Sequence, residues 1–349
     1  MNDNTSNINE RRWNPLFQRW TIMALARQDR PLDVKSVLDN NPPVIMQSEE
    51  EMEAERSRCP FCVGAPEVPE PFDVKVLGNR FPALDQSYTE AVFDPGSPYK
   101  VGPAFGHQEV VLYTPDHYQK FGNLPVDHLV KLANTWKERY IAVSNMPGIE
   151  YVFQFENRGA MIGVSLKHPH GQLYGFSWIP HYVKAEIESV KAYKEETGRC
   201  LLCDIIKHDS EEGTRVIKEN DNFITIAPFF AAWPHEVHVY PKKHVQSLVD
   251  FDDDMILDFA KIMKDINYRF DNLYPGYESA FVMAFHAKPT NDENYDYFHF
   301  HLDFYPPMRK AGVQKFTAGV ETSMGDFINS TLPEETAEKL RAIDVPDVE

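Results

Sequence analysis

The feature that most restricts the fold of this chain is an ordered set of cysteines and histidines that occurs twice. The segment "CPFC" supplies Cys59 and Cys62, and "CLLC" supplies Cys200 and Cys203. Each pair is followed by an alternating apolar stretch, a proline turn and a histidine, and later by a His-x-His tripeptide within "HPHGQ" or "HFHLD". Chance easily gives one such match, but three matches in the same order indicate an internal duplication.

Each copy has the pattern of an α+β unit. The segments "EVVLY" and "EVHVYP" alternate as strands do. Residues 126–145 and 252–274 carry apolar side chains at helical spacing. We therefore expect an α+β fold of two pseudo-symmetric halves, residues 1–190 and residues 191–349, with antiparallel sheets and flanking helices.

Three further segments predict helices outside these units. Residues 183–200 predict a charged, mostly exposed helix that links the halves. Residues 47–58 are acidic and predict an exposed helix, and residues 332–343 predict a short helix that begins near Pro333.

Composition narrows the class of protein. Apolar residues make up 42% of the chain, which allows a substantial core, and no apolar run of about 18 residues predicts a membrane span. The polar N-terminus lacks the apolar stretch of a secretory signal, so we expect a cytoplasmic protein. A formal net charge of −18 argues against a general nucleic-acid binder, which needs a basic surface.

The cysteines then indicate metal binding. Without an export signal, paired C-x-x-C motifs favour metal or redox sites over a disulfide framework, and a thioredoxin-like redox motif would need a neighbouring βαβ pattern. Structural zinc takes four nitrogen or sulfur ligands in a tetrahedron. The alternative is that the thiols are free and the histidines are scattered. The two proposed ligand sets are Cys59, Cys62, His117 and His168 in the first half, and Cys200, Cys203, His244 and His299 in the second.

Several motifs resemble one known family. They are "GNRFPAL", "TPDH", "FENRGAMIGVSLKHPHGQ", "AAWPHEVHVYPKKH", "HFHLDFYPP" and "KFTAGVE", and the match runs from about residue 11 to residue 321. Together they are similar to the galactose-1-phosphate uridylyltransferase family, a nucleotidyl-transferring branch of the histidine-triad superfamily. The resemblance implies two histidine-triad-like halves and a homodimer whose active sites are shared between chains.

The resemblance also implies the chemistry of "HPHGQ". His168 would bind zinc, whereas His170 would attack the α-phosphorus of UDP-glucose and carry the uridylyl group to galactose 1-phosphate. A backbone carbonyl within the motif would hold the other ring N–H of His170. Gln172 would donate an amide N–H to a phosphate oxygen, with Ser165 similarly placed, and Gly171 would let the phosphate approach closely.

Other positions match the family one at a time. The matched substrate residues are Arg27 and Arg30 near the phosphates, Asn79 and Asn157 at the nucleotide, and Lys315, Phe316 and Glu321 at the sugar phosphate, the last three from the partner chain. Arg80 departs from relatives that carry an acidic residue there, which leaves the ribose contacts open. Some members bind a further metal, often iron as Fe²⁺; the matching ligands here are Glu186, His286 and His301, with Asp303 where some relatives have a histidine.

Two other functions compete with this interpretation. A sister enzyme, an ADP-glucose phosphorylase or adenylyltransferase, shares the double C-x-x-C pattern but often has serine at the position of Gly171. A catalytically idle, zinc-structured nucleotide binder would not need His170, Gln172 and both arginines.

Overall fold

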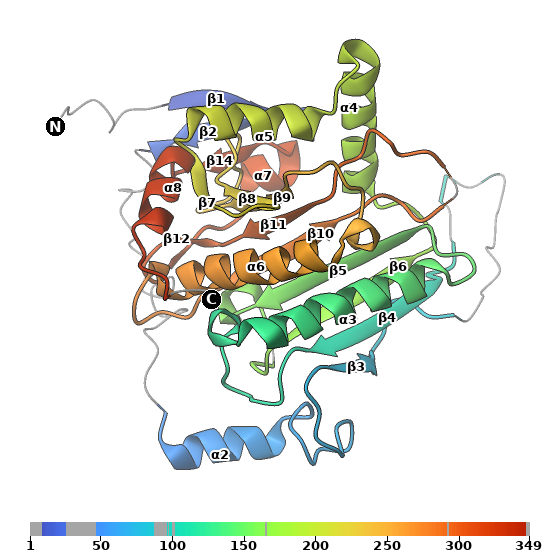
Figure 1. Ribbon diagram of the computed structural model, residues 1–349, viewed down its shortest axis with the longest axis vertical. Helices are drawn as coiled ribbons and strands as arrows, with labels where there is room; N and C mark the ends of the chain where they lie inside the picture. The colour runs from blue at the N-terminus through green and yellow to red at the C-terminus, as the bar shows by residue number, and fades with distance from the viewer. Residues whose placement is uncertain are drawn as a thin grey trace.

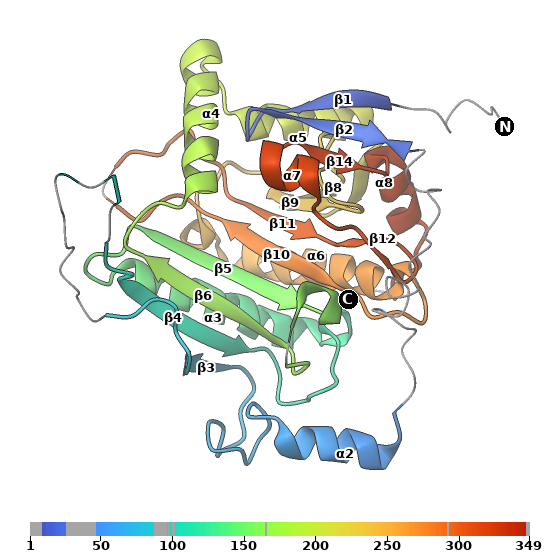
Figure 2. The same ribbon diagram turned by 180° about the vertical axis from the view of Figure 1, so that it is seen from behind.

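A nine-stranded antiparallel sheet forms the centre of the protein, and both halves of the chain contribute to it (Figure 1, Figure 2). The structure, a computed structural model, describes residues 9–25, 47–86, 96, 98–99, 102–164, 166–291 and 293–346. In spatial order the strands are β3 (Lys75–Gly78), β4 (Gly106–Leu112), β6 (His170–Phe176), β5 (Tyr151–Arg158), β10 (Phe281–His286), β11 (His301–Tyr305), β9 (Val237–Pro241), β8 (Phe223–Ile226) and β7 (Val216–Glu219). The predicted α+β class with antiparallel strands is confirmed.

The duplication in the sequence is also a duplication in space. Reading outward from the pair β5–β10, one half runs β5, β6, β4, β3 and the other runs β10, β11, β9, β8. Helix α3 (Val126–Ser144) precedes β5, and α6 (Asp253–Leu273) precedes β10. The two halves do not carry separate sheets, because β5 and β10 hydrogen-bond to each other and join them.

Helices α3 and α6 lie side by side on one face of the sheet (Figure 1). Each bears an apolar stripe, and the stripes enclose the main core, where the Trp136 ring lies 5.2 Å from that of Phe285. Two lysines make reciprocal contacts. Lys137 on α3 donates to the carbonyl that precedes α6, and Lys264 on α6 donates to the carbonyl that precedes α3, both at 2.5 Å.

The other helices surround this core. Helix α2 (Glu49–Arg58) begins with a capping box and buries no residue, as predicted. Helix α4 (His181–Thr197) was predicted to be mostly exposed, but one face of it is buried, including Glu186. Helix α5 (Leu201–Glu212) follows it directly. Within the described ranges, no helix is long and apolar enough to cross a membrane.

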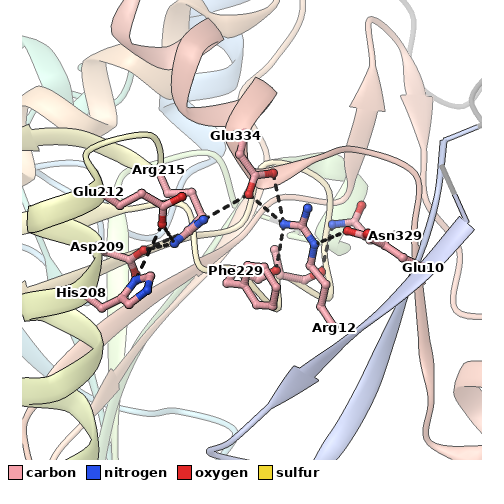
Figure 3. A network of polar contacts seen from close by, with 10 residues as sticks. Glu10, Arg12, His208, Asp209, Glu212, Arg215, Phe229, Asn329 and Glu334 are labelled. Atoms are coloured by element: carbon pink, nitrogen blue, oxygen red, sulfur yellow. Dashed lines mark hydrogen bonds and ion pairs between the residues drawn. The ribbon is translucent and has the colours of Figure 1, made fainter. Parts of the chain in front are cut away.

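Segments from the first and last parts of the described chain pair on the second half. Strands β1 (Asn9–Asn14) and β2 (Arg19–Ala24) form a hairpin, and β14 (Phe327–Asn329) pairs with β2 in parallel. Ion pairs connect this small sheet to the second half (Figure 3). Glu334 of α8 (Pro333–Arg341) lies 2.9 Å from Arg12 of β1 and 3.2 Å from Arg215. Arg215 also pairs with Asp209 of α5. The short elements between β11 and β14 are β12 (Met308–Lys310), β13 (Val313–Gln314) and α7 (Gly319–Met324).

Candidate metal centres and active site

The first cysteine pair and its two histidines form one cluster. Cys59 caps the end of α2, His117 follows β4, and His168 immediately precedes β6. The four ligand atoms of Cys59, Cys62, His117 and His168 all lie within 4.8 Å of one another. The Nε2 atom of His168 lies 2.8 Å from the carbonyl oxygen of Thr114. A carbonyl only accepts, so Nε2 carries the proton and Nδ1 points its lone pair at the sulfurs.

The donor set of this cluster fits a metal ion. Burial, with Cys59 as its neighbour, raises the pKa of Cys62, so two adjacent thiolates need a nearby cation. Burial lowers the pKa of His168 to about 4, which keeps the imidazole neutral and able to coordinate. Two sulfurs and two neutral imidazole nitrogens are ligands that a borderline-soft divalent metal accepts.

The second cysteine pair forms a matching cluster. Cys200 is the N-cap of α5, Cys203 lies in its first turn, and the ligand atoms of Cys200, Cys203, His244 and His299 lie within 4.8 Å of one another. The Nε2 atom of His299 is 3.0 Å from the carbonyl oxygen of Pro241. This contact corresponds to that of His168 Nε2 with the carbonyl oxygen of Thr114, at 2.8 Å. The same backbone device therefore orients one histidine in each cluster.

His170 begins strand β6 and is not part of the metal cluster. His168 lies two residues before the strand. The Nδ1 atom of His170 lies 2.8 Å from the carbonyl oxygen of His168, which fixes the proton on Nδ1. The Nε2 atom makes no hydrogen bond or ion pair with any residue that the structure describes. The half-buried ring lies 5.2 Å from that of Phe61. His170 thus presents an available lone pair in a fixed direction.

Gln172 lies on the same face of β6 as His170, and Gly171 lies on the opposite, buried face. A Cβ atom on Gly171 would collide with the Tyr113 hydroxyl and would lie 3.1 Å from the carbonyl oxygen of Phe155. The expectation that Gly171 makes room for a phosphate is therefore wrong. The glycine is required by packing behind the strand, because its missing side chain leaves space for Tyr113.

A third cluster lies in the second half, where Glu186 from α4 sits between two histidines. Its carboxylate oxygens are 3.1 Å from His286 Nδ1 and 2.9 Å from His301 Nε2, and all three side chains are buried. Burial would raise the pKa of Glu186, but the two histidines lower it well below its usual range. Asp303 approaches the other ring nitrogen of His286, at 3.6 Å. One carboxylate and two imidazoles could hold a metal ion, and Asp303 stands outside that group.

The other predicted substrate residues occupy different places. Asn79 follows β3, where its side chain accepts from the backbone N–H of Phe81 at 2.9 Å, and Asn157 lies on β5. Lys315 and Glu321 pair with each other at 2.8 Å beside α7, in the opposite half from β6 (Figure 2). Phe316 is exposed. Arg27, Arg30 and Ser165 lie outside the described residues.

Sequence reasoning missed two polar residues beside Gln172. The Tyr174 hydroxyl donates to the side-chain oxygen of Gln172 at 3.2 Å, and Gln108 lies opposite Tyr174 on β4. A signal was present, because a tyrosine follows the second histidine of His-x-His by four residues in both "HGQLY" and "HLDFY".

A fourth group of possible metal ligands consists of His208, Asp209 and Glu212. Its two carboxylates pair with the guanidinium of Arg215, so their charge is already balanced without a metal ion (Figure 3).

Comparisons with known proteins agree with this architecture. The family profile of the galactose-1-phosphate uridyl transferase N-terminal domain matches residues 1–180, and that of the C-terminal domain matches residues 186–348. Galactose-1-phosphate uridylyltransferase of Thermotoga maritima is 34% identical over 96% of this chain and 99% of its own length. The Haemophilus influenzae enzyme of the same name is 30% identical over 95% and 94%.

Solved structures give the same answer. A uridylyltransferase structure superposes with a TM-score of 0.76 at 30% identity, covering 96% of this chain and 98% of the other. An ADP-glucose phosphorylase from Arabidopsis thaliana, with bound ADP-glucose, gives a TM-score of 0.76 at 25% identity, covering 97% and 100%. Two family profiles that together span nearly the whole chain, and full-length relatives at 30% identity or more, lead to one conclusion: the chain belongs to the galactose-1-phosphate uridyl transferase family.

Proposed function

We propose that this protein transfers a uridylyl group from UDP-glucose to galactose 1-phosphate through a covalent intermediate on His170. The observation that carries this proposal is the state of the His170 ring. Its Nδ1 proton is held by the His168 carbonyl at 2.8 Å, so the lone pair of Nε2 is free to attack phosphorus. A neutral imidazole needs no separate base for this step.

Each half-reaction exchanges one bond to phosphorus. Nε2 of His170 forms a bond to the α-phosphorus of UDP-glucose while the bond to the bridging oxygen breaks, and glucose 1-phosphate leaves. A phosphate oxygen of galactose 1-phosphate then attacks the same phosphorus, the P–N bond breaks, and UDP-galactose leaves. The Nδ1 proton stays on the imidazole throughout, and the covalent intermediate divides one difficult displacement into two easier ones.

Other side chains would bind and orient the substrates. Gln172 shares the strand face of His170 and would donate its amide N–H to a phosphate oxygen as charge develops. Ser165, Arg27 and Arg30 would contact the phosphates, and Asn79 and Asn157 the nucleotide, as the family resemblance implies. Helix α7, which carries Glu321, lies away from β6 (Figure 2). As the family resemblance implies, Lys315, Phe316 and Glu321 would serve the active site of a partner chain in a homodimer.

The metals and the domain division are part of the proposal. We assign Zn²⁺ to each Cys₂His₂ cluster, because thiolates favour zinc, and zinc or iron to the cluster of Glu186, His286 and His301. The zinc bound to His168 would fix the segment whose carbonyl holds His170. The first unit would comprise residues 1–190 and the second residues 191–349, with the β1–β2 hairpin docked on the second. We further propose that the enzyme is cytoplasmic and acts on neither nucleic acid nor membranes.

An ADP-glucose phosphorylase is the second candidate, because the Arabidopsis thaliana enzyme of that name is 27% identical over 96% of this chain. The two candidates differ in the nucleotide that His170 would carry. The test is the intact mass of the protein after mixing with UDP-glucose or with ADP-glucose. A uridylyl adduct that galactose 1-phosphate removes supports the first candidate, whereas an adenylyl adduct that inorganic phosphate removes supports the second. No adduct with either sugar nucleotide would contradict both.

A further inference from the structure

A buried glutamine on β4, Gln108, links the loop after β3 to β6, the strand that carries His170. The side-chain oxygen of Gln108 accepts the backbone N–H groups of Ala83, at 2.6 Å, and Leu84, at 3.3 Å. A backbone N–H can only donate, so the oxygen of this amide must face the loop. The amide nitrogen is thereby turned the other way, and it is buried with no hydrogen-bond partner among the described residues.

The side chain of Gln108 lies next to that of Tyr174. The two residues lie directly opposite each other on the antiparallel strands β4 and β6, where facing side chains are in contact distance. Burial raises the pKa of Tyr174, and the Gln108 side chain acts in the opposite direction, as a donor to the hydroxyl oxygen does. The Tyr174 hydroxyl in turn donates to the side-chain oxygen of Gln172 at 3.2 Å.

These contacts have one direction. The loop donates to Gln108 and Tyr174 donates to Gln172, and the Gln108 amide nitrogen is the donor left for the Tyr174 hydroxyl that lies opposite it. Because the Gln172 oxygen is turned toward the hydroxyl, its NH₂ group is the end of the amide that remains for a phosphate. The orientation of an isolated surface amide would be free, since its two ends have the same shape.

The second half repeats the arrangement with different chemistry. Tyr305 donates to the carboxylate of Asp303 at 2.7 Å, in the positions that correspond to Tyr174 and Gln172. Glu236, next to β9, accepts two backbone N–H groups, those of Ala232 at 2.7 Å and Trp233 at 2.9 Å. The Tyr305 hydroxyl is the donor in that pair, and the matching geometry supports the same direction in the first half.

We propose that Gln108 and Tyr174 are positioning residues that set the orientation of the Gln172 amide, so that it presents a donor and not an acceptor to the transferring phosphate. This inference rests on the proposed function, because it assumes that a phosphate oxygen meets Gln172. It also links the loop that carries Asn79 to the reaction centre, since the loop backbone fixes the direction of the whole chain of hydrogen bonds.

A change of one atom reverses this direction. In Gln108→Glu the carboxylate still accepts from the loop, but it would now also accept from the Tyr174 hydroxyl. Tyr174 could then only accept from Gln172, whose oxygen would turn toward the phosphate. We expect saturating UDP-glucose to form the uridylyl adduct about tenfold to 10²-fold more slowly in the folded fraction, close to the effect of Gln172→Ala.

Tyr174→Phe tests the same link from the other side. It should slow adduct formation about tenfold in the wild-type background but by less than about twofold in the Gln172→Ala background, because coupled residues are not additive. Tyr305→Phe is the matched control, since it removes the corresponding hydroxyl in the second half and should leave the rate unchanged in folded protein.

The outcomes separate this inference from the proposed function. If the wild-type protein forms no adduct with UDP-glucose, the proposed function and the inference both fail. If the wild-type protein reacts and Gln108→Glu reacts equally fast, the orientation chain alone is overturned. The same conclusion follows if Tyr174→Phe slows the reaction equally in both backgrounds, because the tyrosine would then act only through the fold.

Discussion

The two His-x-His centres share a backbone device and differ in what faces the second histidine. In each, Nδ1 of that histidine lies against the carbonyl oxygen of the first, at 2.8 Å for His170 and 3.0 Å for His301. In both centres Nε2 is therefore the ring nitrogen left for contacts outside the His-x-His backbone. Around His170 this atom meets no partner among the described residues, whereas that of His301 lies 2.9 Å from Glu186.

An oriented imidazole is therefore not enough to make a nucleophile, because the ring must also be accessible. The strand geometry prepares both imidazoles, but α4 covers His301 with a carboxylate and leaves it fully buried. Two residues further on, the first centre has an amide that can donate, Gln172, and the second has the acceptor Asp303. A phosphate would be repelled at the second centre, which suits a cation instead.

The largest expected effect comes from comparing two single variants, in each of which one of these two histidines is replaced by alanine. His170→Ala should slow uridylyl transfer by on the order of 10⁴-fold or more, because the bond-forming atom is lost, while metal content and melting temperature stay the same. His301→Ala should lower the melting temperature, because it leaves Glu186 buried with one partner fewer, and should retain the transfer rate in the folded fraction. Intact mass and rapid-quench kinetics measure both.

His170→Gly provides a further control, since added imidazole should restore part of the transfer. Ordinary exchange activity in His170→Ala would refute the assignment of the nucleophile. An inactive but stably folded His301→Ala would break the comparison, since the second centre would then take part in the chemistry.

Much of this architecture could be predicted from local patterns. Both Cys₂His₂ clusters follow from the repeated order of motifs, and α3 and α6 begin and end within two residues of the predicted ranges. These features depend on spacing within short segments. The burial of Glu186 could not be predicted, because its helix has a charged sequence and only a tertiary contact, with His286 and His301, brings one carboxylate inside.

The roles of Gly171 and Tyr174 also depend on information that spacing does not carry. The register of β4 against β6 decides that Gly171 meets Tyr113 and that Tyr174 meets Gln108. The joining of the halves through β5 and β10, and the docking of the N-terminal hairpin beside β14, are pairings between distant segments. Spacing within a short segment does not predict which distant strand edge it will pair with.

The metal clusters give the next largest effect, and here the halves should differ in activity. Cys59→Ser should lose about one zinc ion per chain, lower the melting temperature by about 5 °C or more, and slow transfer, because His168 positions His170. Cys200→Ser should lose one zinc ion and stability but keep most of the transfer rate in folded protein. X-ray absorption should give an average of two sulfurs per zinc at about 2.3 Å.

Normal zinc content and an unchanged melting temperature in Cys59→Ser would rule out the first site. One zinc per chain, with Cys200 and Cys203 freely alkylated in the native protein, would rule out the second.

Gly171 offers a smaller and more local test. Leu302 occupies the corresponding place in the second half and is fully buried, whereas Gly171 faces Tyr113 and has no room for a side chain. Gly171→Ala should lower the free energy of unfolding by about 1–3 kcal/mol. The double variant Gly171→Ala with Tyr113→Phe should recover part of this loss, which urea denaturation would measure. No recovery would show that the carbonyl of Phe155 limits the space.

The last prediction concerns the pH dependence of stability, which a buried histidine of the second half should set in part. His235, in the second half, is buried between the hydroxyls of Tyr274, at 2.7 Å, and Thr336, at 3.1 Å. Burial, and to a lesser extent Lys339, lowers the pKa of His235 to about 3. The unfolded chain takes up this proton near pH 6.5 and the folded protein does not, so the free energy of unfolding falls as the pH drops from about 6.5 to 3.

The variant His235→Asn tests this. Asparagine tolerates the positive φ of 54° at this position, and its side chain does not titrate. Between pH 6 and pH 4 its stability should therefore decline less steeply than that of the wild-type protein, by about 1.4 kcal/mol per pH unit. Equal slopes in urea titrations of the two proteins would place the acid sensitivity elsewhere in the molecule.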